Sequence, residues 1–218
     1  MCGRFSFAAL AKDVEKRFGI IVHGLGNTAR FNCAPTQNLA VITNQEPEKL
    51  NYFRWGLIPF WAKDIKIGNK LINAKAETID QKPSFKNSFL RRRCLVPADG
   101  FYEWKKAKEK IPYRIILKNN ELFSIAGIWD KWKDQNGEEI NSFSIITTNP
   151  NELVNKIHNR MPVILHQEDE KTWLENKSVE ELKKLLKPFP ANKMEAFPIS
   201  KLINSPLNDF AEVIEPLK

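Results

Sequence analysis

The sequence contains few cysteines and no long hydrophobic run, and each absence excludes a class of protein. Three cysteines among 218 residues (Cys2, Cys33 and Cys94) are too few and too scattered for a disulfide scaffold, and they lack metal-ligand spacing. No apolar stretch approaches the roughly 18 residues of a membrane span, and the N-terminus lacks the basic-then-apolar pattern of a signal peptide. We therefore expect a cytoplasmic protein with no membrane association, no metal and no other cofactor.

Internal repeats, low-complexity tracts and linkers that would divide the chain are also missing. Hydrophobic residues make up 42% of the sequence and charged residues 28%, which is typical of a globular protein with an ample core. Short strands and short helices alternate without a regular strand–helix–strand rhythm, which favours an α+β fold with a curled sheet. We predict one β-rich domain over residues 1–218 and expect a monomer.

Local patterns predict the individual elements. Ser6 could cap a first helix that ends before Gly19, and Ser178 with Glu181 forms the pattern of a capping box. Runs rich in β-branched and aromatic residues predict strands. Strands are expected at residues 39–42, 50–55, 94–97, 100–104, 113–117, 123–128, 142–148, 163–165, 194–199 and 213–217. Helices are expected at residues 6–18, 84–90, 151–157, 168–175 and 179–186.

Positive charge is concentrated in the first half of the chain. The net charge is +8, but residues 1–110 carry 20 Lys and Arg against 10 Asp and Glu, whereas residues 111–218 carry 14 against 16. A basic half with interspersed aromatic residues suggests a polyanion partner, most simply nucleic acid. A lysine-rich surface that only confers solubility is the alternative.

Cys2 directly follows the initiator methionine. An aminopeptidase can remove Met1 before so small a side chain, which would leave a thiol and an α-amine on adjacent carbons. The α-amine has a pKa of roughly 7.7–8.0, so part of it is neutral near pH 7. Such an aminothiol condenses with an aldehyde to an imine, and the thiol then closes a thiazolidine ring. The alternative is that Cys2 is only a small hydrophobic residue at a tolerant terminus.

Three further polar residues are candidates for a site. Asn73, Glu103 and His158 each lie at an expected strand end or in a loop, beside aromatic or basic neighbours. Each has a structural alternative: Asn73 could turn the backbone, Glu103 could pair with Lys105 or Lys106, and His158 could be a helix-end residue. The residues interpreted as structural are His23, His166, Cys33 and Cys94.

Five sequence blocks in order resemble one family. They are MCGRF at residues 1–5, WGLIPFW at 55–61, NAKAET at 73–78, GFYEW at 100–104 and HNRMP at 158–162. The chain resembles the SRAP family, the abasic-site processing proteins also called SOS-response-associated peptidases. The resemblance runs from residue 2 to about 165. It implies a β-rich α+β domain with a curled, barrel-like mixed sheet and short peripheral helices.

The resemblance also implies roles in a covalent reaction with DNA. Cys2, exposed by removal of Met1, would attack the aldehyde of an abasic site in single-stranded DNA and form a protein–DNA link that protects the lesion. Glu103 would transfer protons at the imine or thiazolidine stage, and His158 would do so at the sugar oxygen. Asn73 would hold the N-terminal residue or the sugar. A carboxylate and an imidazole within hydrogen-bond reach suit such proton transfers near neutral pH.

The same resemblance implies a DNA-binding surface. Arg4, Lys75 and Arg160 would contact phosphates, although many relatives carry Arg at the position of Lys75, and Lys lacks the bidentate fork. Trp61, with Trp55 and Pro35, could stack on or wedge beside exposed bases; Trp55 is the stronger candidate for the core.

Two other functions remain open from the residues alone. One is a cysteine peptidase or amidase of the N-terminal-nucleophile type that acts in trans, with His158 as the partner of Cys2. The other is a nucleic-acid-binding β domain without chemistry, for which the basic half suffices and Cys2 is dispensable.

Overall fold

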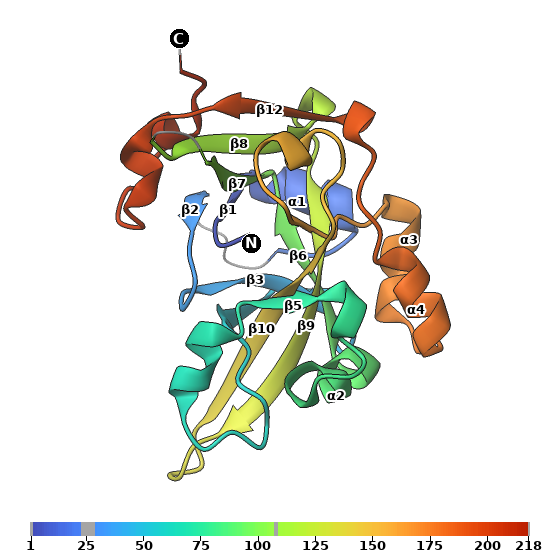
Figure 1. The fold of residues 1–218 in the computed structure, drawn as a ribbon. Helices are drawn as coiled ribbons and strands as arrows, with labels where there is room; N and C mark the ends of the chain where they lie inside the picture. Colours follow the sequence, from blue (N-terminus) through green and yellow to red (C-terminus); the bar gives the residue numbers. More distant parts are fainter. Residues whose placement is uncertain (1, 23–28, 107–108, 218) are drawn as a thin grey trace.

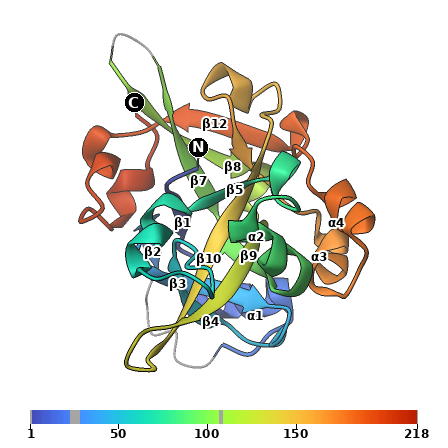
Figure 2. The same ribbon diagram turned by 60° about the horizontal axis from the view of Figure 1, so that its bottom comes forward.

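The computed structural model describes residues 2–22, 29–106 and 109–217. The strands of these residues form two sheets, one above the other in Figure 1, and the first described residues lie between them. Figure 2 shows the same arrangement from below. His23, interpreted above as structural, lies outside the described residues.

The lower sheet closes on itself. Its closed path runs β10–β4–β3–β6–β9 and returns from β9 to β10. Its members are β3 (Asn38–Thr43), β4 (Asn51–Trp55), β6 (Arg93–Ala98), β9 (Phe123–Lys133) and β10 (Glu139–Thr148). β4 and β10 run parallel and the other pairs are antiparallel, so this ring is a small mixed barrel without free edges. The predicted α+β fold with a barrel-like mixed sheet is confirmed.

Two short strands extend the ring beside β10. β5 (Asn73–Lys75) pairs with β10 in parallel, and β11 (Met161–Pro162) pairs with it in antiparallel. The loops around β5 and β11 therefore lie at the same end of the ring, although more than 80 residues separate them in the sequence.

The upper sheet is open and wholly antiparallel, and the sequence did not predict it as a separate sheet. Its order is β12–β8–β7–β1–β2. The strands are β1 (Phe5–Phe7), β2 (Arg30–Cys33), β7 (Gly100–Lys105), β8 (Ile111–Leu117) and β12 (Met194–Pro198). The chain passes from the ring to this sheet at Asp99–Gly100. A side chain at Gly100 would begin 2.8 Å from the Arg114 Nε atom, so a larger residue at this corner would require Arg114 to move.

Helices lie around the sheets and contribute little to the site. They are α1 (Ala11–Phe18), α2 (Pro83–Arg91), α3 (Gln167–Leu174) and α4 (Val179–Leu185). The capping box predicted at Ser178 and Glu181 is present at the start of α4. None of the helices in the described part of the chain is long and apolar enough to cross a membrane.

Four predicted elements differ in the structure. Residues 5–7 form β1 instead of the first turn of a helix, because they pair with β2 and β7; the Ser6 hydroxyl donates to the Asp99 carboxylate, and α1 begins only at Ala11. A short 3₁₀ helix (Val154–Lys156) replaces the helix predicted at 151–157. A 3₁₀ helix, η7 (Ala211–Ile214), includes the first two residues of the strand predicted at 213–217, and Pro216 makes only an isolated bridge with Ile199. In place of the strand predicted at 163–165, β11 ends at Pro162 and Ile164 makes only an isolated bridge with Ile125.

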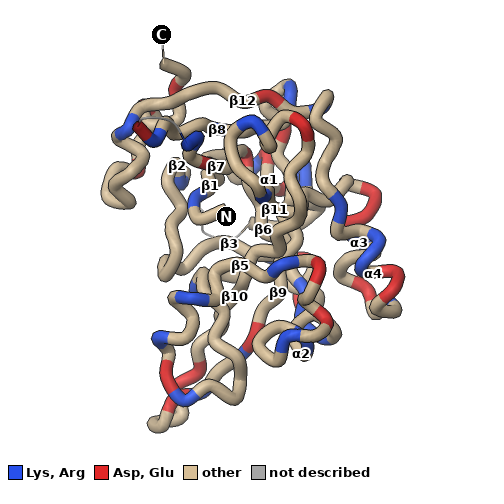
Figure 3. Tube along the Cα trace, in the orientation of Figure 1, with Lys and Arg blue, Asp and Glu red and all other residues tan. Residues whose placement is uncertain are grey.

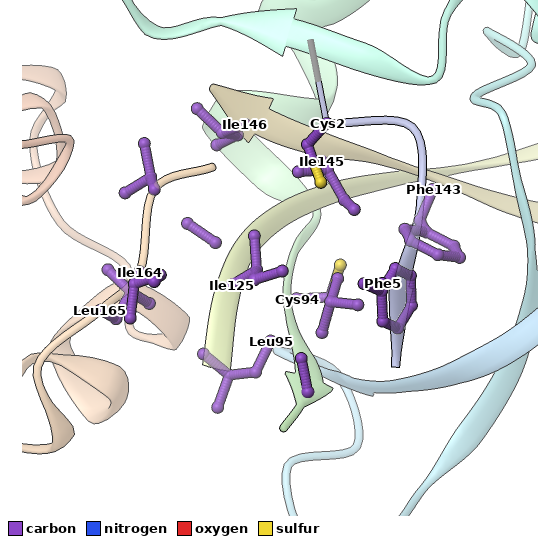
Figure 4. Packing of buried hydrophobic residues seen from close by; sticks show 14 of the residues in the cluster. Cys2, Phe5, Cys94, Leu95, Ile125, Phe143, Ile145, Ile146, Ile164 and Leu165 are labelled. Atoms are coloured by element: carbon purple, nitrogen blue, oxygen red, sulfur yellow. The ribbon is translucent and has the colours of Figure 1, made fainter. Parts of the chain in front are cut away.

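The main hydrophobic core fills the ring and the space between it and the upper sheet. Cys33 and Cys94 are fully buried there, as predicted. Figure 4 shows Cys94 within this cluster and Cys2 nearby, beside Ile145 of β10. The cysteine of the N-terminal segment is thus part of the packed interior.

Candidate active site

The four candidate residues come together where the two sheets meet. Cys2 precedes β1 and Glu103 lies on β7, both in the upper sheet. Asn73 begins β5 and His158 lies in the loop before β11, both at the end of the ring. The structure therefore assembles one site from residues that are up to 156 positions apart in the sequence.

The Asn73 side chain forms a hydrogen bond with the main chain of the N-terminal segment. Its amide nitrogen donates to the Cys2 carbonyl oxygen at 2.7 Å, and its side-chain oxygen is buried with no hydrogen-bond partner among the described residues. An orphaned buried acceptor costs free energy unless a ligand or solvent donates to it. Asn73 thus holds the segment that bears Cys2 and does more than turn the backbone.

The Cys2 side chain is fully buried, and its thiol makes a weak contact of 3.8 Å with the Arg4 carbonyl oxygen. Burial, reinforced by the nearby carboxylate of Glu103, raises the pKa of the Cys2 thiol to about 12. The thiol is therefore protonated at neutral pH, and its attack on a substrate requires a neighbouring group that accepts the proton.

Glu103 lies close enough to the Cys2 thiol to raise the pKa of that thiol. The Glu103 side chain is nearly inaccessible to solvent, and burial raises its own pKa to about 7. Its Oε1 atom lies 3.7 Å from the Nδ1 atom of His158. A carboxyl group that titrates near neutral pH both accepts and donates protons efficiently there.

The surroundings of His158 define its protonation state. Burial lowers the pKa of the imidazole, and the backbone N–H of Arg160 donates to its Nδ1 atom at 3.1 Å. The same Nδ1 atom lies 3.3 Å from the Arg160 carbonyl oxygen, so the role of Nδ1 as donor or acceptor depends on the tautomer. His158 is thus a mainly neutral imidazole beside Glu103.

A cavity of about 460 Å³ opens beside Glu103 and His158. Its other lining residues are Trp104, Lys106, Lys110 and Asn204. Among the described residues, no group of three or more His, Cys, Asp or Glu side chains is arranged to hold a metal ion. The carboxyl and imidazole groups that line this cavity are of the types that transfer protons near neutral pH.

Two arginines expected to contact phosphates have partners within the protein. Arg4 donates to the Asn32 side chain at 2.6 Å and to the Ile203 carbonyl oxygen at 2.8 Å. Arg160 forms a bidentate ion pair with Glu77 at 2.6 and 3.0 Å and also donates to the Thr147 carbonyl oxygen at 2.6 Å. Either guanidinium would have to give up such bonds, or share them, to bind a phosphate.

The remaining DNA-contact candidates differ in exposure. Trp61 is 47% exposed and Lys75 is also exposed, whereas Pro35 is half-buried in a turn. Trp55 is fully buried, and its indole N–H donates to the Ile72 carbonyl oxygen at 2.9 Å. The prediction that Trp55 stacks on bases is therefore wrong, because its ring packs between Phe5 and Phe143 in the core.

Sequence reasoning missed several residues of the site. Trp104 lies inside one of the recognised blocks, directly after Glu103, but was not assigned a role. Lys106 and Lys110 were counted only as part of the basic half. Asn204 carries no signal in the sequence, because only the fold brings it next to Trp104.

Figure 3 shows the basic residues distributed along the chain, with acidic residues interleaved on α3 and α4 to one side.

Fold and site together define a class: β-rich α+β proteins in which a cysteine at the start of the chain lies beside a buried glutamate and a histidine. Comparison with known proteins identifies the family. The model of the SOS response associated peptidase (SRAP) family matches residues 1–206. The chain belongs to this family.

Individual relatives support the assignment. The chain is 47% identical over 223 residues to the abasic site processing protein YoqW of Bacillus subtilis (strain 168), and the match covers 99% of each chain. It is 34% identical over 192 residues to the abasic site processing protein HMCES of Gallus gallus, which covers 76% of this chain and 56% of that protein. A crystal structure of a protein from Bacteroides thetaiotaomicron superposes with a TM-score of 0.91 at 36% identity over the full length of both chains.

Proposed function

We propose that this protein processes abasic sites in single-stranded DNA by forming a covalent link between Cys2 and the sugar aldehyde. The observation that carries the proposal is the convergence of Asn73, Glu103 and His158 on the N-terminal segment that bears Cys2. The names of the curated relatives, which refer to abasic site processing, support the same substrate. The reaction requires a free α-amine on Cys2, and hence removal of Met1.

The chemistry follows from the groups at the site. The α-amine of Cys2 attacks the C1′ aldehyde, and the resulting carbinolamine loses one water to give an imine. The thiol sulfur then bonds to the imine carbon, while its proton passes to the imine nitrogen. The product is a thiazolidine ring, and the net loss from protein plus DNA is one water. No oxidant or metal takes part in either step.

Proton transfers in this sequence suit Glu103 and His158. Glu103, with a pKa near 7, accepts the thiol proton and returns it to nitrogen, or donates to the leaving hydroxyl of the carbinolamine. His158 donates a proton to the ring oxygen of the closed sugar, which favours the open aldehyde. Because the Cys2 thiol is buried and protonated, attack by the amine precedes attack by sulfur.

DNA binding is proposed to involve the exposed residues near the end of the ring. Trp61 offers an indole face for an unpaired base, and stacking of this kind contributes roughly 1–3 kcal/mol per base without sequence preference. Lys75 is placed two residues after Asn73 and supplies positive charge for a flanking phosphate. Phe60, also exposed, is adjacent to Trp61 and widens the apolar surface.

Intact-mass measurement of the purified protein tests the central claim. The mature protein should lack Met1, and incubation with an abasic oligonucleotide should add the mass of the oligonucleotide minus one water. An active, crosslinking protein that retains Met1 would exclude the thiazolidine mechanism. Turnover of peptides in trans without any DNA adduct would favour a cysteine peptidase, and reversible DNA binding alone would favour a domain without chemistry.

Removal of Met1 by the protein itself is a second proposed activity. The matched family is described as a peptidase family, and the proton-transferring Glu103 lies beside the residue that would be exposed. Synthesis of the protein in a cell-free system without methionine aminopeptidase tests this activity. Wild type should lose Met1 there and Glu103→Gln should retain it; retention in both would show that another enzyme removes it.

A further inference from the structure

The last part of the chain packs on the face of the upper sheet that is turned away from the core. This segment, residues 199–217, contains η6 (Lys201–Asn204) and η7 (Ala211–Ile214), and we call it the C-terminal clamp. It forms a small hydrophobic cluster of its own, in which Ile199, Ile203 and Val213 pack with Tyr102 of β7. The clamp therefore covers the strand that carries Glu103.

Alternation along β7 separates the clamp from the reacting groups. Successive side chains of a strand point to opposite faces, and Tyr102 and Trp104 both pack toward the clamp. Glu103, between them, faces the site beside His158. The clamp thus contacts Tyr102 and Trp104, the two sequence neighbours of Glu103.

A specific hydrogen bond joins the clamp to the wall of the site. The indole N–H of Trp104 donates to the Asn204 side-chain oxygen at 2.8 Å, and both residues line the cavity of Glu103 and His158. Without this acceptor the indole N–H would lose its protein partner. The position of Trp104, and of the backbone on which Glu103 lies, therefore depends on the clamp.

Arg4 joins the clamp to the N-terminal segment. Its guanidinium donates to the Ile203 and Asn204 carbonyl oxygens at 2.8 and 3.3 Å. Its own carbonyl oxygen accepts from the Tyr102 backbone N–H at 3.0 Å, and Cys2 lies two residues earlier. Arg4 thus connects three parts of the molecule: the segment of Cys2, the strand of Glu103 and the clamp.

Asn32 on β2 completes the attachment. Its side-chain oxygen accepts from Arg4, and its buried amide nitrogen donates to the carbonyl oxygens of Ser205 and Asn208 at 2.9 and 2.8 Å. In addition, the Asp209 carboxylate of the clamp accepts a hydrogen bond from the Asn32 backbone N–H at 2.9 Å. So many directed bonds at one buried residue indicate a defined docking geometry for the clamp.

We propose that the residues that attach the C-terminal clamp act in the active site: Arg4, Asn32 and Asn204 are positioning residues that hold Cys2 and Glu103 in their reacting geometry. This role rests on the function proposed above. It also gives Arg4 a task other than the phosphate contact expected from the sequence, and the two tasks predict different kinetics.

The experiment measures formation of the heat-stable link with an abasic oligonucleotide, as a function of DNA concentration, salt and pH. The variants are Arg4→Gln, Asn204→Ala, Trp104→Phe and the double variant of the last two. Trp104→Phe keeps an aromatic ring and removes the N–H donor together with part of the ring volume. Leu207→Ala is the matched control, because Leu207 lies in the clamp but is 91% exposed. Thermal unfolding of each protein checks that it is folded.

Positioning predicts a loss of maximal rate at saturating DNA. Asn204→Ala and Trp104→Phe should each slow the link about 2- to 10-fold, the equivalent of one hydrogen bond, and the double variant should be no slower than the singles, because both remove the same contact. Arg4→Gln should slow it about tenfold or more, because small misplacements of reacting groups are costly. The half-saturating DNA concentration and its salt dependence should stay close to those of wild type.

A pH profile separates positioning from a general loss of structure. Loosening the clamp lets water reach Glu103, which should move the midpoint of the profile from near pH 7 toward lower pH. Leu207→Ala should match wild type in every respect. If Asn204→Ala and Arg4→Gln link at the wild-type maximal rate, or if Arg4→Gln only weakens binding and lowers the salt slope by about 0.7, the proposal is wrong. A wild-type protein that forms no link would instead overturn the function on which the clamp's role rests.

Discussion

The two halves of the site differ in how deeply they are buried. Cys2 and Glu103, supplied by the upper sheet, are almost inaccessible to solvent, whereas Asn73 and His158, supplied by the ring, are only partly buried. Burial changes pKa values, and the two largest shifts at the site accordingly fall on Cys2 and Glu103. The upper sheet thus contributes the deeply buried thiol and carboxyl group of the site, and the ring contributes its more accessible amide and imidazole.

Substitution of the sulfur in the buried half should have the largest effect. Cys2→Ala keeps the α-amine but cannot close the ring, so it should form only a hydrolysable imine and give at least about a 1,000-fold loss of heat-stable link. Denaturing gels of DNA after incubation measure both the link and strand cleavage, which should increase because the imine leaves the sugar prone to elimination. A Cys2→Ala protein that forms wild-type amounts of heat-stable link would refute the mechanism.

Glu103→Gln should have the next largest effect. The amide has nearly the same size but cannot transfer a proton, so the rate of linking should fall by about 10²–10⁴ while DNA affinity stays nearly constant. Single-turnover kinetics at saturating DNA measure the rate. The transition near pH 7 should disappear in the variant; its persistence would mean that another group titrates there.

The same substitution should raise stability at alkaline pH. The folded-state pKa of Glu103 is raised above its unfolded value by burial, so the stability associated with its protonated form is full below the unfolded pKa and is lost as pH rises through about 7. Glu103→Gln has no such loss and should be more stable than wild type at pH 8 by on the order of 1 kcal/mol. Thermal denaturation at pH 5 and pH 8 measures the difference, and an equal pH dependence in both proteins would contradict burial as the cause.

Residues on the ring side should affect binding more than chemistry. Trp61→Ala should weaken binding to single-stranded DNA about 5- to 100-fold at every salt concentration, whereas Lys75→Ala should reduce the logarithmic salt slope by about 0.7. Both variants should reach the wild-type rate of linking at saturating DNA. Fluorescence titrations over a salt series provide the affinities. A reduced maximal rate in either variant would contradict the expectation that these two residues act in binding alone.

Removal of the Glu77–Arg160 ion pair should have the smallest effect, and the direction of the change in DNA affinity shows what Arg160 does. If Arg160 binds a phosphate, the Glu77 carboxylate competes with that phosphate for the guanidinium. Glu77→Gln should then raise DNA affinity a few-fold at low salt, because the free energy of a partly exposed ion pair is small. If Arg160 instead serves to hold His158 through its backbone N–H, Glu77→Gln should lower the maximal rate and leave affinity unchanged. The linking assay at saturating and limiting DNA distinguishes the two, and the matched control is Glu46→Gln, which removes an exposed ion pair elsewhere.

Much of the site was accessible from the sequence, because its chemistry depends on residue types that the chain shows directly. An aminothiol after the initiator, a glutamate between two aromatic residues and a histidine in a polar loop indicated the reacting groups, and the five blocks placed them in one family. Local physics also determined α2, α4 with its capping box, and most strands of the ring, since propensity and capping act within a few residues.

Only the tertiary structure decided which of these residues meet and which remain free. Residues 5–7 became a strand because β2 and β7 offer backbone partners that no local pattern reveals. Trp55 went into the core, and Arg4 and Arg160 took carbonyl and carboxylate partners from distant segments. The Asn204 side chain accepts a hydrogen bond from Trp104, which lies 100 residues earlier in the sequence. The sequence by itself determined the chemical groups and the local elements; burial and long-range pairing, which depend on the whole chain at once, decided their protonation, their partners and their access to DNA.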